Sequence, residues 1–181
     1  MSVIAVYVTD QKIILGGDTQ TTYGHYKMLE SYYGKIFDIN GTYIGGVGTC
    51  FEIQFFRRFL EEKKLRQGFT EKDFNDLMLD FYTYFRHHTK DEVNGIQCNY
   101  ILVHDHKAFL FQNWLIREVE QFEAIGSGGE TARTAYEVFK NLEQEPDMEK
   151  ILSVTCKIDL YCHEPLKIFE IEKTASSEES T

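Results

Sequence analysis

The stretch MSVIAVYV at residues 1–8 decides how the fold begins, because an apolar run starts directly after a serine at position 2. A secretory signal would need a basic start and a longer apolar run, so this stretch does not predict one. We interpret it as a strand that begins at the terminus itself. Chain termini usually fray, so a strand tied into a sheet within two residues needs a packing reason or a chemical reason.

Length and composition indicate a single domain. The chain has 181 residues, among them 14 Phe and 11 Tyr, which suffices for one large core and leaves no obvious room for two. We predict one domain over residues 1–172. The segment 173–181 is rich in Ser and Glu, which is the composition of a disordered acidic tail.

Charge and cysteine usage argue against several classes of protein. The formal net charge is -10, and the sequence lacks the basic stripe that nucleic-acid binding requires. We expect no membrane-spanning segment, because no apolar run is long enough. The cysteines stand far apart and form no CxxC pair, which favours reduced thiols in a cytoplasmic protein over a disulfide framework or a zinc site. They are Cys50, Cys98, Cys156 and Cys162.

Two hairpins are predicted before any helix. The apolar runs 3–8 and 13–15 flank a turn-like segment and read as paired strands that are buried on both faces. The runs 35–39 and 43–47 are joined by Asn40-Gly41, which is a strong turn signal for a second hairpin.

Two helices are expected next. Apolar residues recur at helical spacing from Thr49 onward, and we predict that this helix closes at Gly68 after a basic last turn. Thr70 and Asp73 form a capping-box pair, which predicts the start of a second helix. We assign the aromatic residues of both helices to the core; they include Phe55, Phe56 and those of the run 81–85.

Strands return after these helices. We predict them at 98–103 and 108–111, around a polar turn at Asp105, and again before Glu123. A third helix is expected from near Glu130, where alanine and aromatic residues recur at helical spacing.

The last part of the chain completes four layers. Asp147 is expected to cap a short fourth helix, and strands are predicted at 158–161 and 166–171. Strands buried on both faces need cover on both sides. We therefore predict an α+β fold in which two stacked sheets lie between two helical layers.

Three motifs carry a resemblance to a known family. They are GGDTQTTYGHYKM at 16–28, GKIFDINGTYIGGVGT at 34–49 and AIGSGGETA at 124–132, and a weaker likeness extends through 156–171. Their order and separation resemble the proteasome β-subunit and HslV-like family of N-terminal nucleophile peptidases. The resemblance covers most of the chain. It implies the four-layer αββα sandwich of the N-terminal nucleophile hydrolases.

The resemblance also implies a nucleophile at the first residue of the mature chain, which falls on Ser2 after removal of Met1. An alcohol is a weak nucleophile until a base accepts its proton, and an α-amine with a pKa of about 8 can accept it near neutrality. A nearby ammonium lowers that pKa further by like-charge repulsion. Lys35 matches the family's essential lysine, and Asp18 matches the acid that holds it. The implied activity is peptide-bond hydrolysis through an acyl-Ser2 intermediate.

Four further positions are carried over from the family. Ser127 is expected to orient the amine, and the backbone N–H of Gly46 is expected to stabilise the tetrahedral oxyanion. Thr22 and Gly48 are expected to bind an extended substrate, which would add as a strand. The resemblance implies neither a cofactor nor a metal.

Two departures from the family pattern bear on activity. Ser2 replaces the usual threonine, which keeps the hydroxyl and loses the methyl that restricts its rotamer. The family also carries an Asp and a Ser just before the penultimate strand. We match these to the stretch 151–154, which holds no acid. The sequence therefore predicts that one support of the nucleophile is missing.

Simpler interpretations exist for each residue taken alone. Asp18 could begin a turn, and Lys35 could be an edge charge that blocks sheet pairing. The GSGG stretch at 126–129 could be a helix-entry loop, and it is too short for a dinucleotide fingerprint. His104 and His106 are explained by a hairpin turn without a metal.

Three hypotheses from different classes remain. The first is an endopeptidase in stacked hexameric or heptameric rings that takes unfolded polypeptides, with an ATP-dependent unfoldase as a partner. The second is a catalytically inactive structural ring subunit, and the third is an N-terminal nucleophile amidohydrolase acting on small amides. The joint presence of Ser2, Asp18, Lys35, Gly46 and Ser127 favours the first.

Overall fold

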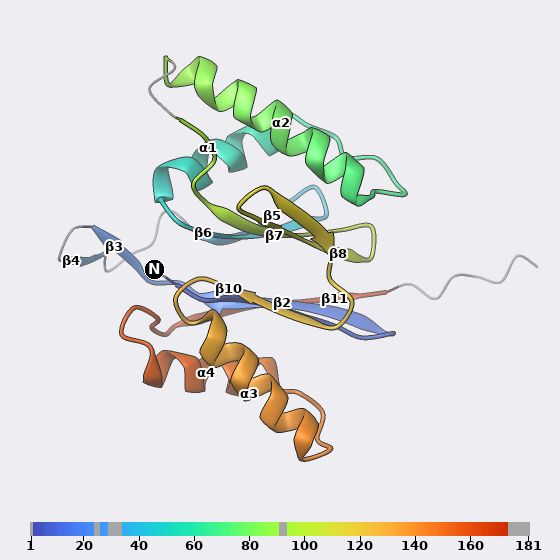
Figure 1. The fold of residues 1–181 in the computed structure, drawn as a ribbon, viewed down its shortest axis with the longest axis vertical. Coiled ribbons are helices and arrows are strands. Elements are labelled where there is room, and N and C mark those ends of the chain that lie inside the picture. The colour runs from blue at the N-terminus through green and yellow to red at the C-terminus, as the bar shows by residue number, and fades with distance from the viewer. Residues whose placement is uncertain (1, 24–25, 29–33, 91–93, 174–181) are drawn as a thin grey trace, which may run out of the picture.

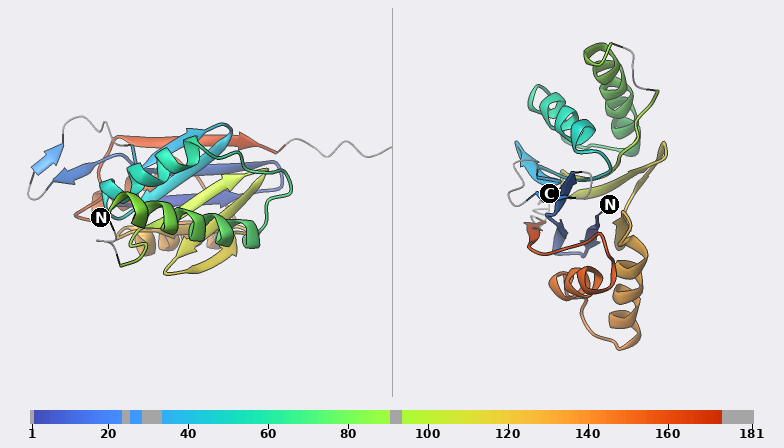
Figure 2. Two further views of the ribbon diagram at one scale, coloured as in Figure 1. Left: turned by 90° about the horizontal axis from the view of Figure 1, so that it is seen from above. Right: turned by 90° about the vertical axis from the view of Figure 1, so that its left-hand side faces the viewer.

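Two stacked β-sheets lie between two pairs of helices in a computed structural model that describes residues 2–23, 26–28, 34–90 and 94–173 (Figure 1). The helices α1 (Cys50–Glu61) and α2 (Glu71–His88) cover one sheet, and α3 (Gly129–Asn141) and α4 (Met148–Ile158) cover the other. The helical pairs therefore lie on opposite sides of the molecule (Figure 2). This is the predicted four-layer α+β sandwich. Of the predicted tail, residues 174–181 lie outside the described residues.

The first sheet contains the strand that begins the chain. Its order is β10-β1-β2-β11, with every neighbouring pair antiparallel. The strands are β1 (Ile4–Val8), β2 (Lys12–Asp18), β10 (Phe122–Ile125) and β11 (Leu166–Glu172). Ile4 is opposite both Gly17 and Ile125, so β1 is central and paired on both sides. The predicted hairpin of β1 and β2 is confirmed.

The second sheet is a five-stranded antiparallel meander of order β5-β6-β7-β8-β9. Its strands are β5 (Ile36–Ile39), β6 (Thr42–Val47), β7 (Asn99–His104), β8 (Lys107–Gln112) and β9 (Leu115–Glu118). Asn40 and Gly41 both have positive φ, which is the backbone of the tight turn predicted between β5 and β6.

A short hairpin that the sequence did not predict follows β2 in the chain. It consists of β3 (Thr21–Tyr23) and β4 (Tyr26–Met28). The hairpin projects beyond the sandwich at the end where the N-terminus lies (Figure 1).

The helices α1 (Cys50–Glu61) and α2 (Glu71–His88) begin where their caps predict. Thr49 caps α1, and the Thr70–Asp73 capping box is present at α2. The predicted closure of α1 at Gly68 is wrong, because the helix ends at Glu61. His104 Nε2 lies 3.1 Å from the Arg66 carbonyl and Gly68 N–H donates to Asp105 across 2.6 Å, so contacts with the second sheet hold this segment as a loop.

The helices α3 (Gly129–Asn141) and α4 (Met148–Ile158) cover the first sheet. Asp147 caps α4 as predicted, with its side chain accepting from Lys150 N–H at 3.1 Å. The predicted strand at 158–161 is wrong. Ile158 is the last residue of α4, and Asp159 is its C-cap.

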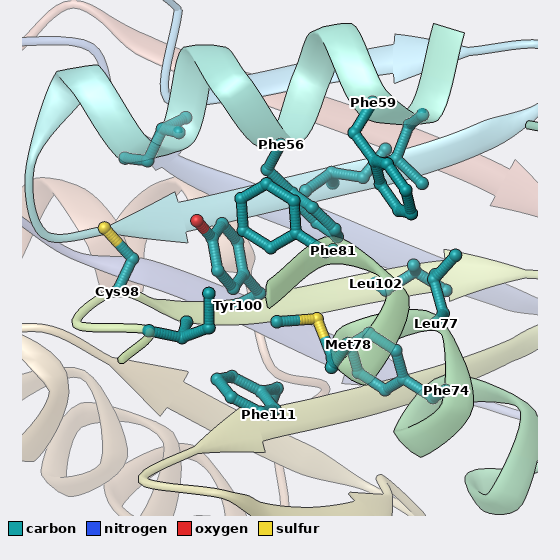
Figure 3. Packing of buried hydrophobic residues seen from close by; sticks show 14 of the residues in the cluster. Phe56, Phe59, Phe74, Leu77, Met78, Phe81, Cys98, Tyr100, Leu102 and Phe111 are labelled. Carbon is teal, nitrogen blue, oxygen red and sulfur yellow. The ribbon is translucent and has the colours of Figure 1, made fainter. Parts of the chain in front are cut away.

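Three apolar layers fill the sandwich. Between α1, α2 and the second sheet lies a cluster rich in aromatic rings, with Phe56, Phe81 and Tyr100 fully buried at its centre (Figure 3). A second cluster separates the two sheets, and a third lies under α3 and α4. The predicted core role of the helix aromatics is confirmed for Phe56, Phe81 and Phe85, while Phe55 is partly buried.

The described part of the chain has no helix long and apolar enough to cross a membrane.

Candidate active site

The structure brings Ser2, Asp18 and Lys35 together at one end of the sandwich. Ser2 precedes β1, Asp18 ends β2, and Lys35 directly precedes β5. Lys35 Nζ donates to Ser2 Oγ at 2.7 Å and to Asp18 Oδ2 at 2.8 Å. The three residues are 3%, 0% and 4% exposed for Ser2, Asp18 and Lys35. A buried ammonium therefore bridges a hydroxyl and a carboxylate.

Asp18 also ties down the beginning of β1. Its Oδ1 accepts from Val3 N–H at 2.9 Å, while its own N–H donates to the Val3 carbonyl at 3.2 Å. A buried ion pair is tolerated when hydrogen bonds satisfy its remaining lone pairs. The carboxylate of Asp18 thus fixes both Lys35 and the residue that follows Ser2. This contact explains why a strand can start two residues from the terminus.

The turn between β10 and α3 holds the carbonyl of Ser2. Gly128 N–H donates to this oxygen at 3.3 Å, and Ser127 Oγ lies 3.5 Å from it. Gly126 has φ +98°, and a Cβ there would collide with the same oxygen. Glycine is therefore required at 126 on both conformational and steric grounds. Ser127 therefore lies beside Ser2 through the Ser2 carbonyl, and the expected role of Ser127 in orienting the amine stays a prediction.

Asp159 supplies an acid that sequence reasoning missed. Ser127 Oγ donates to its Oδ1 at 3.3 Å, and the same oxygen accepts from Tyr161 N–H at 2.8 Å. The expectation that no acid supports this part of the site is corrected, because the stretch 151–154 lies inside α4 and the acid follows the helix. Recognising that α4 continues to Ile158 would have identified Asp159 as a candidate.

The three remaining predicted site positions are Gly46, Gly48 and Thr22. Gly46 N–H donates to the Lys35 carbonyl at 2.8 Å, so it is engaged in strand pairing. Oxyanion stabilisation needs a donor that is free to point at the substrate. That role for Gly46 therefore stays a prediction which this pairing does not support. Gly48 has φ +138° and packs against Cys98, and Thr22 lies in β3 with its side chain outside the description.

Two cysteines that feel the charge of Asp18 are poor nucleophiles at neutral pH. Burial, and then the charge of Asp18, raises the pKa of Cys162 to about 12 and that of Cys156 to about 11. Cys162 Sγ is 4.0 Å from Ser127 Oγ. Because the thiolate is the reactive form, neither cysteine competes with the Ser2 hydroxyl.

The donor set at Ser2 does not resemble a metal site. Within the described residues, no group of three His, Cys, Asp or Glu side chains could hold a metal ion. At Ser2 the side-chain donors are one carboxylate, one hydroxyl and an ammonium, and an ammonium has no lone pair to offer a metal.

The arrangement is suited to nucleophilic chemistry on a hydroxyl. A positive charge next to an alcohol favours its deprotonated form, and a fixed carboxylate keeps that charge in place. A base is still needed to take the proton. The α-amine of Ser2 would provide one on the same residue if Met1 were removed.

The observed fold class agrees with the one that the resemblance in sequence implies. The four layers are those of the αββα sandwich found in N-terminal nucleophile hydrolases. No protein-family model matches the sequence, and no curated protein matches it.

Solved structures give the particular likeness. Thiobacillus denitrificans BPH in complex with epoxomicin superposes with a TM-score of 0.80 at 16% identity, covering 94% of this chain and 98% of that one. Eukaryotic HslV from Trypanosoma brucei has a TM-score of 0.69 at 19% identity, covering 94% of this chain and 99% of that one. The expected proteasome-like and HslV-like fold is confirmed.

Proposed function

We propose that this chain is a proteasome-like endopeptidase whose nucleophile is Ser2 after removal of Met1. The observation that carries the proposal is the Lys35 ammonium, which lies 2.7 Å from Ser2 Oγ and 2.8 Å from Asp18 Oδ2. Removal of Met1 converts the amide nitrogen of Ser2 into a free amine on the same residue. Hydroxyl, base and a charge that lowers the pKa of that base then lie together.

The reaction proceeds in two halves. The amine takes the proton of Ser2 Oγ as the oxygen bonds to the substrate carbonyl carbon, and the carbonyl electrons move onto its oxygen. Collapse of this intermediate breaks the C–N bond, and the leaving amine takes the proton from the Ser2 ammonium. The same amine then takes a proton from water as the water oxygen bonds to the ester carbonyl carbon. The bond from that carbon to Ser2 Oγ breaks, Oγ takes the proton back from the amine, and the carboxylic acid is released. Lys35 takes no part in these proton transfers and acts electrostatically.

The proposed substrates are unfolded polypeptides, and the proposed assembly is a stacked ring in the cytoplasm. The fold likeness to HslV supports ring self-association. A chamber formed in this way would admit extended chains, and an ATP-dependent unfoldase would supply them.

One observation favours a second candidate, a catalytically silent ring subunit. Gly46 N–H donates to Lys35 and is not free for an oxyanion. Turnover of an unstructured protein such as casein separates the candidates. The endopeptidase cleaves it and Ser2→Ala does not, whereas a silent subunit shows no difference between the two. Cleavage of small amides alone would indicate an amidohydrolase.

A further inference from the structure

Glu52 is a buried carboxylate that the proposed mechanism does not use. It lies in the first turn of α1 and is 1% exposed. Its Oε2 accepts from Gln97 N–H at 2.9 Å, and its Oε1 accepts from Cys98 N–H at 2.9 Å and from Tyr100 Oη at 3.1 Å. One bond reaches Tyr100 in β7 and two reach the residues directly before that strand, so Glu52 fastens α1 to the start of β7.

Tyr100 in β7 lies behind Gly46 of β6, and Cys98, which precedes β7, lies behind Gly48, which follows β6. A Cβ on Gly46 would lie 3.1 Å from the Tyr100 ring, and one on Gly48 would collide with Cys98 Sγ. The next residue, Thr49, donates its N–H to Cys98 Sγ at 3.2 Å. In Figure 3 the Tyr100 hydroxyl points toward α1, and its ring lies beside Phe56. The position of β7 therefore determines where the segment 46–49 can lie.

That segment is bonded directly to Lys35. Gly46 N–H donates to the Lys35 carbonyl at 2.8 Å, and Lys35 Nζ donates to Ser2. Glu52 is thus bonded to Tyr100, Tyr100 is opposite Gly46 in the pairing of β6 with β7, and Gly46 is bonded to the backbone of Lys35. We propose that Glu52 is a positioning residue, which fixes Lys35 against Ser2 by holding β7 behind the glycines of β6. This inference rests on the proposed function of Ser2.

The chemistry of the contact requires a carboxylate. Each of the three partners is a donor, and an ionised carboxylate only accepts. In Glu52→Gln the shape is kept, but one end becomes an NH2 group. Whichever way that amide is turned, its NH2 group faces at least one donor. The substitution therefore breaks the contact while it preserves the volume.

The test compares Glu52→Gln with a matched acid-to-amide change at Asp73. Asp73 caps α2 and bonds Thr70 and Arg66, and its segment meets β7 at the opposite end, where Gly68 N–H bonds Asp105. Asp73→Asn therefore disturbs the same helical layer far from Cys98. Steady-state hydrolysis of a peptide and the rate of epoxyketone labelling are measured for wild type and both variants, with unfolding followed in urea.

Glu52→Gln should lower kcat and the labelling rate by about tenfold or more with KM little changed, because a misplaced lysine slows the chemical step. Asp73→Asn should lose stability and keep the wild-type kcat. Equal kcat in wild type and Glu52→Gln would overturn the inference and leave the proposed function standing. Wild type that neither turns over peptide nor labels would overturn both.

A milder variant covers the case in which Glu52→Gln does not fold. Tyr100→Phe removes one donor and leaves both backbone bonds to Glu52. It should lower kcat less than Glu52→Gln, again with KM little changed. An unaltered kcat in folded Tyr100→Phe, with Glu52→Gln unfolded, would count against the inference.

Discussion

The ammonium of Lys35 lies 2.7 Å from the hydroxyl of Ser2, and both side chains are shielded from solvent. A lysine at a strand edge normally keeps its charge in water. Here Asp18 accepts from the same ammonium, so the charge is held inside the sandwich and directed at one oxygen. This geometry anchors the start of the chain, and it supports the proposed role of Ser2 as a nucleophile.

Removing the charge of Lys35 should abolish turnover. Lys35→Met keeps the length of the side chain, and we expect kcat/KM to fall by about 100-fold or more because Ser2 loses its electrostatic support. Peptide hydrolysis measures this effect. Lys12→Met is the control, because Lys12 pairs with the exposed Glu170. This variant should hydrolyse peptides at the wild-type rate. Full activity in Lys35→Met would exclude a role for the lysine in catalysis.

Lys35→Met also leaves the buried Asp18 without its positively charged partner, which should cost about 3–5 kcal/mol of unfolding free energy. The double variant Asp18→Asn/Lys35→Met removes both charges and should recover much of that stability without recovering activity. Urea unfolding measures the stability of each variant. Recovery of turnover in the double variant would show that the charge of Lys35 is not needed for catalysis.

Ser127 and Asp159 should act as one unit. Ser127→Ala and Asp159→Ala each remove the 3.3 Å hydrogen bond between them, so the double variant should be little worse than either single one. We expect a coupling energy of about 0.5–3 kcal/mol in the double-mutant cycle on kcat/KM. Strictly additive losses would show that Asp159 does not act through Ser127.

Gly126→Ala should be far more harmful than Gly41→Ala. Both glycines have positive φ, but a Cβ at 41 meets open space whereas one at 126 collides with the Ser2 carbonyl. Gly41→Ala should cost about 1–3 kcal/mol of unfolding free energy from backbone strain alone. Gly126→Ala should cost more and should also slow labelling of Ser2. Similar stability and labelling in both variants would contradict this placement of Ser2.

Buried thiols should resist alkylation in the native protein. Burial is the main cause that raises the pKa of Cys98 and of Cys162 to about 12, so little thiolate forms at pH 8. Iodoacetamide followed by peptide mass mapping should find both cysteines unmodified until urea is added. Rapid modification of either one in the folded protein would show that its site is open.

The cap of α2 should contribute a pH-dependent part of the stability. Hydrogen bonds from Arg66 and then Thr70 hold the pKa of Asp73 well below its ordinary value. A depressed folded-state pKa stabilises the protein above the unfolded-state pKa of about 4, and this contribution is lost as the pH falls through the folded-state value. The stability difference between wild type and Asp73→Asn should therefore shrink below pH 4. A stability difference between wild type and Asp73→Asn that stays constant from pH 7 to pH 2 would contradict a lowered pKa of Asp73 in the folded protein.

Local signals predicted the parts of the fold that depend on neighbours in sequence. Asn40-Gly41 defines a turn, and Thr70 with Asp73 defines a helix start, because both act within four residues. The end of α1 depends instead on contacts of Arg66 and Gly68 with the second sheet. Such long-range partners leave no periodic signal, which is why Gly68 alone was misleading.

The site was predictable only in part for the same reason. Ser2, Asp18, Lys35 and Ser127 were identified by resemblance, and the structure places all four together. Asp159 was hidden because alternating apolar residues after 157 read as a strand, although Leu160 is 82% exposed. Glu52 looks in sequence like an acid that favours a helix N-terminus, and its buried role depends on β7.

The most direct test of Ser2 as an N-terminal nucleophile is the intact mass of the purified protein, measured before and after incubation with epoxomicin or another peptide epoxyketone. Such a compound closes a ring only on a terminal residue that offers both a hydroxyl and an α-amine. Met1 should be absent, and one adduct should form per chain, with none in Ser2→Ala. A mass that retains Met1 and gains no adduct would contradict Ser2 as the nucleophile and favour a silent ring subunit.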